Sequence, residues 1–553
     1  MSQSLLAFDT DHIKRYVFGT SKLKEIRGAS SILDDLNRTE TVKATKASTT
    51  RKIFAHGGSA LFLIDEENAE QEAEQLGKTV QKLYRDRTGD GASITYAVQP
   101  IPTNSIKDIM KAEQVTPDVS MEQVLQLLRV RLRLAKDSQQ MGASHYISLP
   151  THALLCICKS CGMAYAEDIL PDPDEPDSRY CRICKGKRDE DENVRKTTFG
   201  KIRAAQSPSR SNEDEHKEQK LWDRILRTLS KQGYDLSGKI DRPSDFQAFR
   251  DLTNGKGYLG LIYADANSMG KAIEAQKTLA AVEQFAQRID DAVFTAMGEA
   301  IKEHLPVQKD MLPFDVLLVG GDDIVMVTSA DKALTVARTL AEQFHKHSGG
   351  YTLSVGVVLA PVTYPFNLQL KLAEDILKDA KKTGAKSQVK SNGAPEEARI
   401  SFVVITGSTS LSYEKLHHEM ERKATNAARE EFQATLRPYT LRDFTRLLDR
   451  LQAGKELRLG RTKLHQLREA ILKLNRTTTI LESLALLRNW NTKERDFIRE
   501  MVQELDNHLT QKEREQRGTL FPWYLESAKE ASENDTYRTP LLDFVELYDF
   551  VSL

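Results

Sequence analysis

Apolar and polar positions along this chain follow two rhythms. Short apolar runs bounded by turn residues predict strands, and apolar residues recurring every three to four positions predict helices. Residues 1–150 and 257–411 repeat one order: strand, helix, two strands joined by a glycine turn, helix, strand and a closing amphipathic helix. This is the split βαβ, or ferredoxin-like, order. Its repetition predicts an α+β protein built by internal duplication.

The second repeat carries acidic residues at the turn between its two central strands. An apolar hairpin spans 314–327, and its corner reads Gly320-Gly321-Asp322-Asp323. The matching corner of the first repeat is interpreted as Gly57-Gly58-Ser59-Ala60, which has no carboxylate. If the corner is catalytic, the first repeat is degenerate and the second has kept the chemistry. A solvated turn is the alternative, since Gly and Asp are turn residues anyway.

A cysteine cluster lies between the repeats, in residues 151–190. Cys158-x-x-Cys161 and Cys181-x-x-Cys184 have the spacing of a structural zinc site with four thiolate ligands. Four thiolates leave no open position for chemistry, so the role is expected to be structural. All 5 cysteines fall between 156 and 184, which favours a metal site in a reducing cytosol over disulfides. Cys156, outside the motif, is expected to be a small buried residue.

The remaining segments read as connections and a separate helical region. Residues 191–256 predict a charged linker followed by a helical bridge, and the polar stretch 185–220 is expected to be mobile or exposed. A strand at 400–405 is expected to join the second sheet. Residues 412–553 show helical periodicity and predict a helical bundle. A basic loop in this bundle fits a solvated helix end or an RNA contact equally well; it contains Lys455, Arg458, Arg461 and Lys463.

Composition narrows the class of protein. The 553 residues are 40% hydrophobic with a formal net charge of −1, so no overall basic field indicates nucleic acid. No apolar run is long enough for a membrane helix, and the N-terminus has no signal-peptide pattern. A cytoplasmic protein without a membrane partner is therefore expected.

The predicted topology assembles a candidate active site. The first and third strands of a split βαβ unit are neighbours, so Asp265 is expected beside Asp322 and Asp323. Three carboxylates at one sheet edge predict a magnesium or manganese site for in-line attack on a phosphate. Backbone groups after Asp265 and at the corner are expected to approach the nucleotide, and a lysine on the last helix could reach its triphosphate or be an ordinary surface lysine. These nucleotide-binding candidates are Ala266, Asn267, Ser268, Gly270, Gly320, Gly321 and Lys381.

These motifs resemble a known family. Asp265, the GGDD corner, Ser354-Val355-Gly356-Val357 and the segment 373–384 are similar to nucleotidyl cyclases of the GGDEF and polymerase-palm type. Two tandem palms, the CxxC…CxxC element, the helical tail and the N-terminal phrase FDTDHIKRYVFGTSKLKEIRGAS narrow the resemblance. The chain resembles the large subunit of type III CRISPR effector complexes, the Cas-ten family, closest to its Cmr-two branch.

The resemblance implies an activity and a set of roles. The family's palm makes cyclic oligoadenylate from ATP, as an antiviral second messenger, when the complex binds target RNA. By position Asp265, Asp322 and Asp323 match its metal-binding carboxylates, and Lys381 matches the lysine of its last palm helix. Other effector subunits, guide RNA and target RNA are the implied partners, unless the protein works in a stand-alone or reduced system.

One departure and two alternatives accompany this resemblance. Many members begin with a histidine–aspartate nuclease domain, but this sequence starts at the first palm and has no His-Asp dipeptide, so no DNase activity is expected. A catalytically silent scaffold that binds guide RNA and partners is one alternative. Three repelling carboxylates held together favour an enzyme over that scaffold. A diguanylate cyclase is the other, and the zinc insertion, duplicated palm and helical tail count against it.

Overall fold

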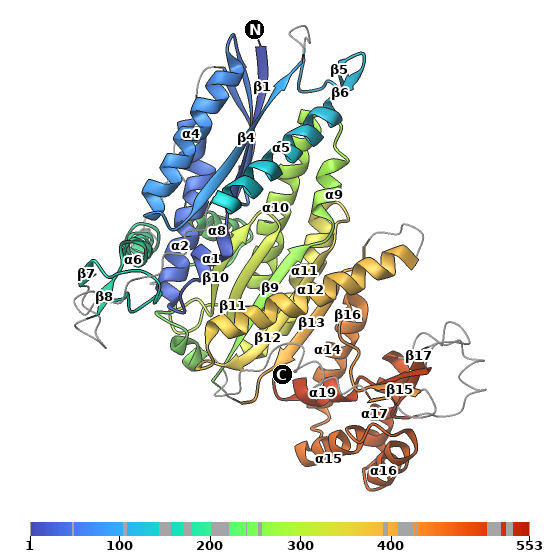
Figure 1. Ribbon diagram of the computed structural model, residues 1–553. Helices are drawn as coiled ribbons and strands as arrows, with labels where there is room; N and C mark the ends of the chain where they lie inside the picture. The colour runs from blue at the N-terminus through green and yellow to red at the C-terminus, as the bar shows by residue number, and fades with distance from the viewer. Residues whose placement is uncertain are drawn as a thin grey trace.

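The computed structural model shows two sheet-containing domains side by side and a separate C-terminal domain beneath the second (Figure 1). The described residues are 2–46, 49–102, 108–142, 156–169, 178–200, 220–238, 240–252, 257–390, 396–407, 424–425, 430–505, 521–526 and 535–551.

The first palm is a four-stranded antiparallel sheet of order β2-β3-β1-β4. Alternate residues of its central strand face opposite sides, because side chains in a strand have a period of two. Leu6 packs with helices α2 and α4, and Leu5 packs with helix α5. The elements are β1 (Ser2–Asp11), α1 (Ile13–Phe18), α2 (Leu23–Asp35), η1 (Leu36–Glu40), α3 (Thr41–Ala44), β2 (Thr50–His56), β3 (Ser59–Glu66), α4 (Ala69–Thr88), β4 (Ser93–Ile101), β5 (Gln114–Thr116), β6 (Val119–Ser120) and α5 (Met121–Gly142).

The second palm repeats this topology in a larger sheet of order β10-β11-β9-β12-β13-β16. Its first four strands have the connectivity of the first sheet, which confirms the predicted duplication. The predicted strand near residue 400 also joins the sheet, as β13, parallel to β12. The elements are β9 (Tyr258–Ala266), α9 (Met269–Glu274), α10 (Leu279–His304), β10 (Phe314–Gly320), β11 (Asp323–Ser329), α11 (Ala330–Ser348), β12 (Leu353–Pro361), α12 (Phe366–Lys390), β13 (Arg399–Val404) and β16 (Tyr439–Thr440).

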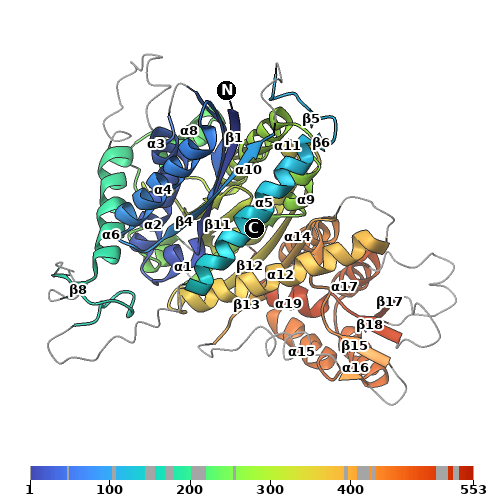
Figure 2. The same cartoon turned by 45° about the horizontal axis from the view of Figure 1, so that its top comes forward.

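The two palms share one hydrophobic core. Helices α10 and α11 cover one face of the second sheet. The opposite face, where Leu261 and Tyr263 lie, packs against α12 and against helix α2 of the first palm. Burial of this shared apolar surface stabilises the palms against each other. Helix α2 of the first palm contacts strand β10 of the second palm, and the tilted view shows the two palms lying against each other (Figure 2).

The segment after the cysteines is ordered, and the prediction of a mobile linker from residue 185 is wrong for the part the structure describes. Helix α6 (Arg182–Val194) continues into η2 (Arg195–Phe199). Val194 and Phe199 are buried, and Asp191 of α6 forms a 2.9 Å ion pair with Arg27 of the first palm. Arg27 also pairs with Asp315 of β10 at 2.9 Å. Burial of these two apolar side chains, together with the ion pair of Asp191, holds the segment against the palms despite its polar composition. The buried charges of Asp191 and Asp315 are tolerated because Arg27 pairs with both.

The remaining connections are short in the described chain. They comprise β7 (Asp168–Ile169), β8 (Arg179–Tyr180), α8 (Leu221–Lys231) and η4 (Gln247–Leu252). Helix α8 packs in the core of the second palm through Trp222 and Ile225. It therefore belongs to the palm structure and is more than a bridge between domains.

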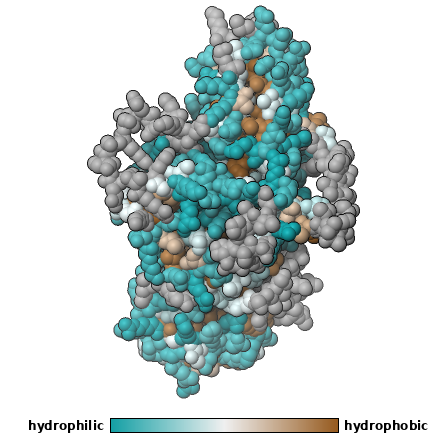
Figure 3. All heavy atoms as spheres, turned by 90° about the vertical axis from the view of Figure 1, so that its left-hand side faces the viewer, coloured by the Kyte–Doolittle hydropathy of each residue, from teal (hydrophilic) through white to brown (hydrophobic). Residues whose placement is uncertain are grey.

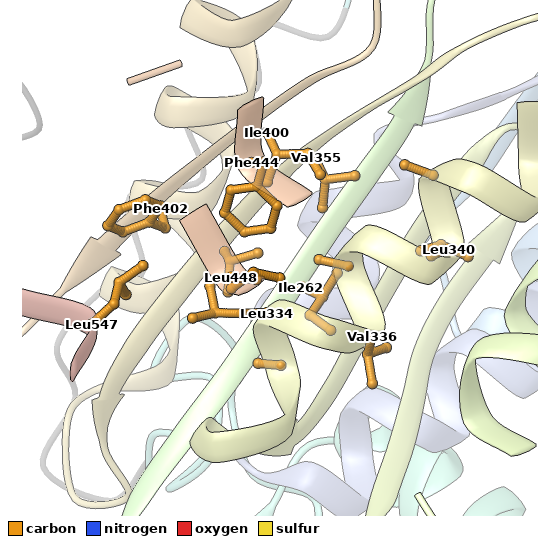
Figure 4. Close-up of a cluster of buried hydrophobic side chains, with 14 of the residues drawn as sticks. Ile262, Leu334, Val336, Leu340, Val355, Ile400, Phe402, Phe444, Leu448 and Leu547 are labelled. Carbon is orange, nitrogen blue, oxygen red and sulfur yellow. The ribbon is translucent and has the colours of Figure 1, made fainter. Parts of the chain in front are cut away.

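The C-terminal domain is mainly helical, as expected, but it also contains a small sheet that periodicity did not predict. That sheet has the order β14-β15-β18-β17. Phe444 and Leu448 of α14 pack on Phe402 of β13 and Leu334 of α11, which fixes the domain to the second palm (Figure 4). Its elements are β14 (Ala424–Thr425), β15 (Glu430–Gln433), α14 (Leu441–Glu456), α15 (Arg461–Ile471), α16 (Arg476–Arg488), α17 (Thr492–Leu505), β17 (Tyr524–Glu526), β18 (Asp535–Arg538) and α19 (Leu541–Tyr548).

One face of the molecule can be described by its hydropathy. The face toward the left of Figure 1 is largely hydrophilic, with apolar side chains in scattered patches (Figure 3). Within the described ranges, no helix combines the length and the hydropathy needed to cross a membrane.

Candidate functional site

The acidic corner lies against the end of the first strand of the second palm. Asp323 begins β11 and is the cross-strand partner of Asp265 on β9. Gly320 and Asp323 close the hairpin, and Gly321 at its tip has a φ of 67°. A positive φ at the first central residue of a two-residue turn calls for glycine. Backbone geometry alone therefore brings carboxylates separated by more than fifty residues into adjacent positions.

The carboxylates at this edge destabilise one another's ionised forms. Burial, reinforced by the charge of Asp265, raises the pKa of Asp322 to about 6. Burial also raises the pKa of Asp323 to about 8, with further contributions from Asp265 and Asp322. A bound divalent cation would relieve this repulsion, and carboxylate oxygens are the ligands that magnesium and manganese prefer. The carboxylate oxygens of Asp265, Asp322 and Asp323 are therefore donors of the type that such a cation takes.

Lys381 contacts this acidic cluster directly. Its ammonium group lies 2.5 Å from an oxygen of Asp265 and donates to the backbone carbonyl of Ala266 at 2.9 Å. The lysine comes from α12, on the side of the sheet that also faces the first palm. A surface lysine was the alternative for this residue, and its half-buried position beside Asp265 favours a role at the site.

The turn after Asp265 is held in place by its own hydrogen bonds. Asn267 is buried; its amide donates to the Thr352 hydroxyl at 2.9 Å, and its side-chain oxygen accepts from Ser354 at 2.9 Å. Its backbone N–H also donates to the carbonyl of Thr352. Asn267 therefore fixes the turn, and we expect it to support a nucleotide-binding loop rather than to contact the nucleotide. Ser268, which has a φ of 59°, precedes the short helix α9 and donates to Glu396.

The first palm contains a hairpin corner that corresponds to the acidic corner of the second palm. The residues that correspond are shifted by one position from those expected. Its hairpin closes on His56 and Ser59, as the other closes on Gly320 and Asp323. Ser59 therefore corresponds to Asp323, and the expected pairing of Gly57-Gly58-Ser59-Ala60 with the GGDD corner is wrong by one residue. The tips differ because both Gly57 and Gly58 have positive φ, so the turn types are not the same.

Sequence reasoning missed two residues of that counterpart. Asp9 of β1 lies opposite Ser59, as Asp265 lies opposite Asp323. Lys136, on the last helix of the first palm, pairs with Asp9 at 2.6 Å. The Asp9–Lys136 pair thus mirrors the Asp265–Lys381 pair. An alignment of the two repeats on their hairpin-closing residues, instead of on their glycines, would have revealed it.

The two glycine corners meet at the boundary between the palms. A side-chain carbon built on Gly57 would lie 2.6 Å from the Cα of Gly321, so only glycine permits this approach. A pocket of about 450 Å³ opens beside the contact, with residues of both palms in its wall. Its lining includes Thr10, His12, Lys14, Asn37, Gly58, Gly320 and Asp323. The acidic edge of the second palm therefore faces a cavity to which the first palm contributes.

A pH dependence of stability follows from Asp323. Its pKa is about 8 in the folded protein against 3.8 when unperturbed, so folding takes up a proton between these values. In magnesium-free buffer the contribution of this group should therefore rise as the pH falls from about 8 to about 4. Asp323→Asn should stabilise the protein at pH 9 by roughly 1–3 kcal/mol and have much less effect at pH 5.

Urea unfolding of the wild-type protein and the Asp323→Asn variant at both pH values would measure this difference. Added magnesium should reduce the gap at pH 9, because the cation relieves the same repulsion in the wild-type protein. An equal effect of the substitution at pH 5 and pH 9 would contradict the proton uptake.

The four motif cysteines form a second candidate site. The sulfur atoms of Cys158, Cys161, Cys181 and Cys184 all lie within 4.8 Å of one another. Tetrahedral zinc–thiolate bonds of about 2.3 Å place sulfurs about 3.8 Å apart, so the donor set fits zinc. Cys156 is exposed, and its expected burial is wrong. It lies just before the motif and outside the cluster of buried thiols.

The basic loop of the C-terminal domain is largely engaged within its own domain. Arg461 pairs with Asp549 at 2.8 Å, and Lys463 pairs with Glu494 at 2.6 Å. Lys455 lies over the ring of Tyr548. These contacts favour the helix-end interpretation of the loop over the RNA contact.

Comparison with known families identifies the second palm. Residues 258–390 match the family model described as Cas10/Cmr2, second palm domain. This part of the chain is similar to a Cas10/Cmr2 second palm. The match runs from β9 to α12 and so includes the acidic edge and Lys381. The resemblance to the Cas-ten family is thereby confirmed, and the assignment to its Cmr-two branch stays a prediction. A comparison with curated proteins gave no match.

Solved structures of Csm1–Csm4 assemblies are similar to this chain, and one of them is similar enough to show a shared fold. A Csm1–Csm4 cassette in complex with cA3 gives a TM-score of 0.50 at 14% identity, covering 99% of this chain and 69% of that chain. The Csm1–Csm4 subcomplex of the type III-A CRISPR-Csm interference complex gives 0.46 at 17% identity, covering 76% and 58%. A cassette in complex with AMPPNP gives 0.45 at 17%, covering 82% and 62%. The present chain thus spans about three fifths of the length of these last two proteins. The likeness to the first extends the shared fold beyond the Cas10/Cmr2 palm.

Proposed function

We propose that this protein is an ATP-dependent nucleotidyltransferase that makes cyclic oligoadenylates in type III CRISPR-type antiviral defence. The Cas10 palm family is related to nucleotidyl cyclases. The observation that carries the proposal is the pairing of Asp323 with Asp265 beneath Lys381, inside a Cas10/Cmr2 second palm.

The proposed reaction joins two ATP molecules. A ribose hydroxyl oxygen of one attacks the α-phosphorus of the other, the bond to the bridging oxygen breaks, pyrophosphate leaves, and the hydroxyl proton is lost to water. Magnesium or manganese held by the three aspartates would supply charge neutralisation and an acidified hydroxyl. Lys381 already neutralises Asp265 and can donate to phosphate oxygens as they approach. The two glycines of the corner leave space for a triphosphate beside the backbone.

The first palm is proposed to hold the acceptor or product nucleotide. Its corner has Gly58 and Ser59 where the second palm has Asp322 and Asp323, so it lacks two of the three carboxylates. It nevertheless keeps an aspartate–lysine pair, Asp9 with Lys136, at the equivalent place. A site with this pair and a glycine turn can bind a nucleotide without activating it. The shared pocket would bring the acceptor to the acidic edge of the second palm.

An asymmetry between the two corners is therefore expected. Ser59→Ala should lower oligoadenylate synthesis by less than about 10-fold, because the hydroxyl holds no catalytic cation. Asp323→Ala, at the equivalent position, should lower it by a factor of about 10³ or more. Steady-state pyrophosphate release by the two purified variants would measure the ratio. Equal losses at both positions would contradict the division of roles.

The proposed partners follow from the relatives. The solved relatives are described as Csm1 in assembly with Csm4. We propose that this chain likewise works with effector subunits, guide RNA and target RNA, and that target RNA activates it. A stand-alone system remains the alternative that an activity assay without RNA would reveal.

One experiment tests the function as a whole. Purified protein is incubated with each labelled nucleoside triphosphate and magnesium, with and without guide and target RNA and partner subunits. Conversion of ATP to cyclic oligoadenylate supports the proposal. Guide RNA and partner binding without any nucleotide product would support the scaffold instead, and a cyclic dinucleotide from GTP would support the diguanylate cyclase.

A further inference from the structure

A lysine of the first palm lies beside the acidic edge of the second. Lys14, in the first turn of α1, lines the pocket between the palms together with Asp323. It lies close enough to Asp323 for its charge to favour the ionised carboxylate. The cluster around Asp323 is therefore approached by two cations, Lys381 from its own palm and Lys14 from the other.

Two residues of the second palm contact Lys14. Its ammonium group lies 3.4 Å from a carboxylate oxygen of Glu374 and 4.8 Å from the centre of the Tyr263 ring. Tyr263 is fully buried, and its hydroxyl has no hydrogen-bond partner among the described residues. An unpaired buried hydroxyl is uncommon and marks a place where a bound group or water is accommodated. Tyr263 lies two residues before Asp265 and so faces the same side of the sheet.

The pseudosymmetry of the palms shows that Lys14 is a specific feature of the first one. Helices α1 and α9 occupy equivalent places after β1 and β9, each preceded by a residue with left-handed backbone, His12 or Ser268. Lys14 is the second residue of α1, and the second residue of α9 is Gly270. The second palm thus presents no side chain where the first presents a cation. Only the first palm therefore contributes a lysine from this helix position to the neighbouring palm.

The Lys14–Glu374 ion pair by itself does little for stability. The lysine side chain is 49% exposed and the glutamate 23%, and pairs of this kind are screened by water. The palms are already joined by a continuous apolar core and by the buried Arg27–Asp315 pair. A partly exposed lysine can exchange the carboxylate for a stronger anion such as a phosphate. Lys14 is therefore better suited to binding a ligand than to joining the two palms.

We propose that Lys14 binds the transferred phosphate of the nucleotide from the side of the first palm. This rests on the proposed nucleotidyl transfer. Lys381 lies beside Ala266, at the end of β9, whereas Lys14 lies beside Tyr263, farther back along the strand. A phosphate at the acidic edge would therefore lie between the two cations. Because Lys14 belongs to the other palm, transfer then depends on the packing of the palms as well as on the aspartates.

Neutral and conservative substitutions test this role. Lys14→Met keeps the length of the side chain and removes its charge, so kcat for pyrophosphate release from ATP should fall roughly 10- to 100-fold, with a smaller change in KM. Lys14→Arg should recover a large part of the rate. Glu374→Gln, which removes the competing carboxylate, should leave the rate at or above that of the wild type. Combined with Lys14→Met, it should have no further effect.

The controls separate a phosphate contact from a structural one. Lys22→Met changes an exposed lysine outside the pocket and should alter neither rate nor melting temperature. Thermal melts of all variants should agree within a few degrees. Calorimetric binding of the α,β-methylene analogue of ATP with magnesium gives a second readout, which should weaken in Lys14→Met and not in Glu374→Gln.

The outcomes also distinguish this inference from the proposed function. A Lys14→Met protein with wild-type kcat, beside an inactive Asp322→Ala/Asp323→Ala protein, would overturn the role of Lys14 and leave the function standing. If Lys14→Met lowered the melting temperature and Lys14→Arg did not recover the rate, Lys14 would serve only to stabilise the contact between the palms. That result would also overturn the proposed role of Lys14. A double aspartate variant that remains active would overturn the proposed function itself.

Discussion

Replacing Asp322 and Asp323 together with alanine is expected to abolish product formation while leaving the protein folded. The transition state of phosphoryl transfer spreads negative charge over the phosphate oxygens, and the substitution removes two of the three carboxylates proposed to hold the neutralising cation. A loss of several kcal/mol of transition-state stabilisation corresponds to a rate decrease of three or more orders of magnitude. The corner glycines are untouched, so the hairpin should form as before.

Stability should hold or rise in the same variant. The pKa values of both aspartates are raised by burial and by neighbouring carboxylates, which means that their ionised forms oppose folding near neutral pH. Pyrophosphate release, oligoadenylate formation and a thermal melt in magnesium-free buffer would measure the two effects together. A well-folded double variant with the wild-type rate would place the chemistry elsewhere and leave the scaffold function standing.

Loss of zinc is expected to have the largest structural effect. Cys181 caps the N-terminus of α6, and Cys184 lies in its first turn, so the metal would fix the start of this helix. The helix packs closely on α2: a side-chain carbon built on Gly28 would lie 1.7 Å from the carbonyl oxygen of Lys187. Lys187 is itself buried, and its ammonium group donates to the carbonyl of Tyr16 at 2.5 Å. Lys187 lies near enough to the cysteines to interact with their charges, so it would offset part of the negative charge of a four-thiolate zinc site.

Cys181→Ser should therefore release the metal and destabilise the protein. Binding of structural zinc is coupled to folding, and a loss of about 3 kcal/mol or more should lower the melting temperature by roughly 3 °C or more. Cys156→Ser is the matched control, because this exposed thiol lies outside the cluster and its loss should change neither property. Elemental analysis of protein purified without added metal should give about one zinc per chain in the wild type and the control. A zinc-free wild-type protein with four freely titratable thiols would refute the site.

Much of the fold could be predicted from local pattern. The order of strands and helices in both palms followed from apolar periodicity, and the repeated order implied the topology of both sheets. The predicted neighbours, the first and third strands of each palm, are paired in the structure. The cysteine spacing led to four sulfurs that do lie together. The catalytic roles of Asp265, Asp322, Asp323 and Lys381 remain predictions for the experiments above.

The misses have identifiable physical causes. Polar composition suggested a mobile segment after residue 185, but a few buried side chains and the Asp191–Arg27 pair hold it in helical form. The first corner was aligned on its glycines, whereas hairpin register is set by the closing pair, His56 with Ser59. A small sheet in the C-terminal domain has strands too short to show a period.

The sequence by itself determined the duplicated βαββαβ order, the acidic corner and the cysteine motif, because periodicity, turn residues and ligand spacing are local properties that neighbouring residues encode. Only the tertiary structure decided how the palms meet. It placed Gly57 against Gly321, paired Lys136 with Asp9, and brought Lys14 to Tyr263 and Glu374. These contacts join residues more than one hundred positions apart and depend on which sheet faces are buried together. Burial of apolar surface fixes that arrangement, and the polar contacts at the palm boundary follow from it.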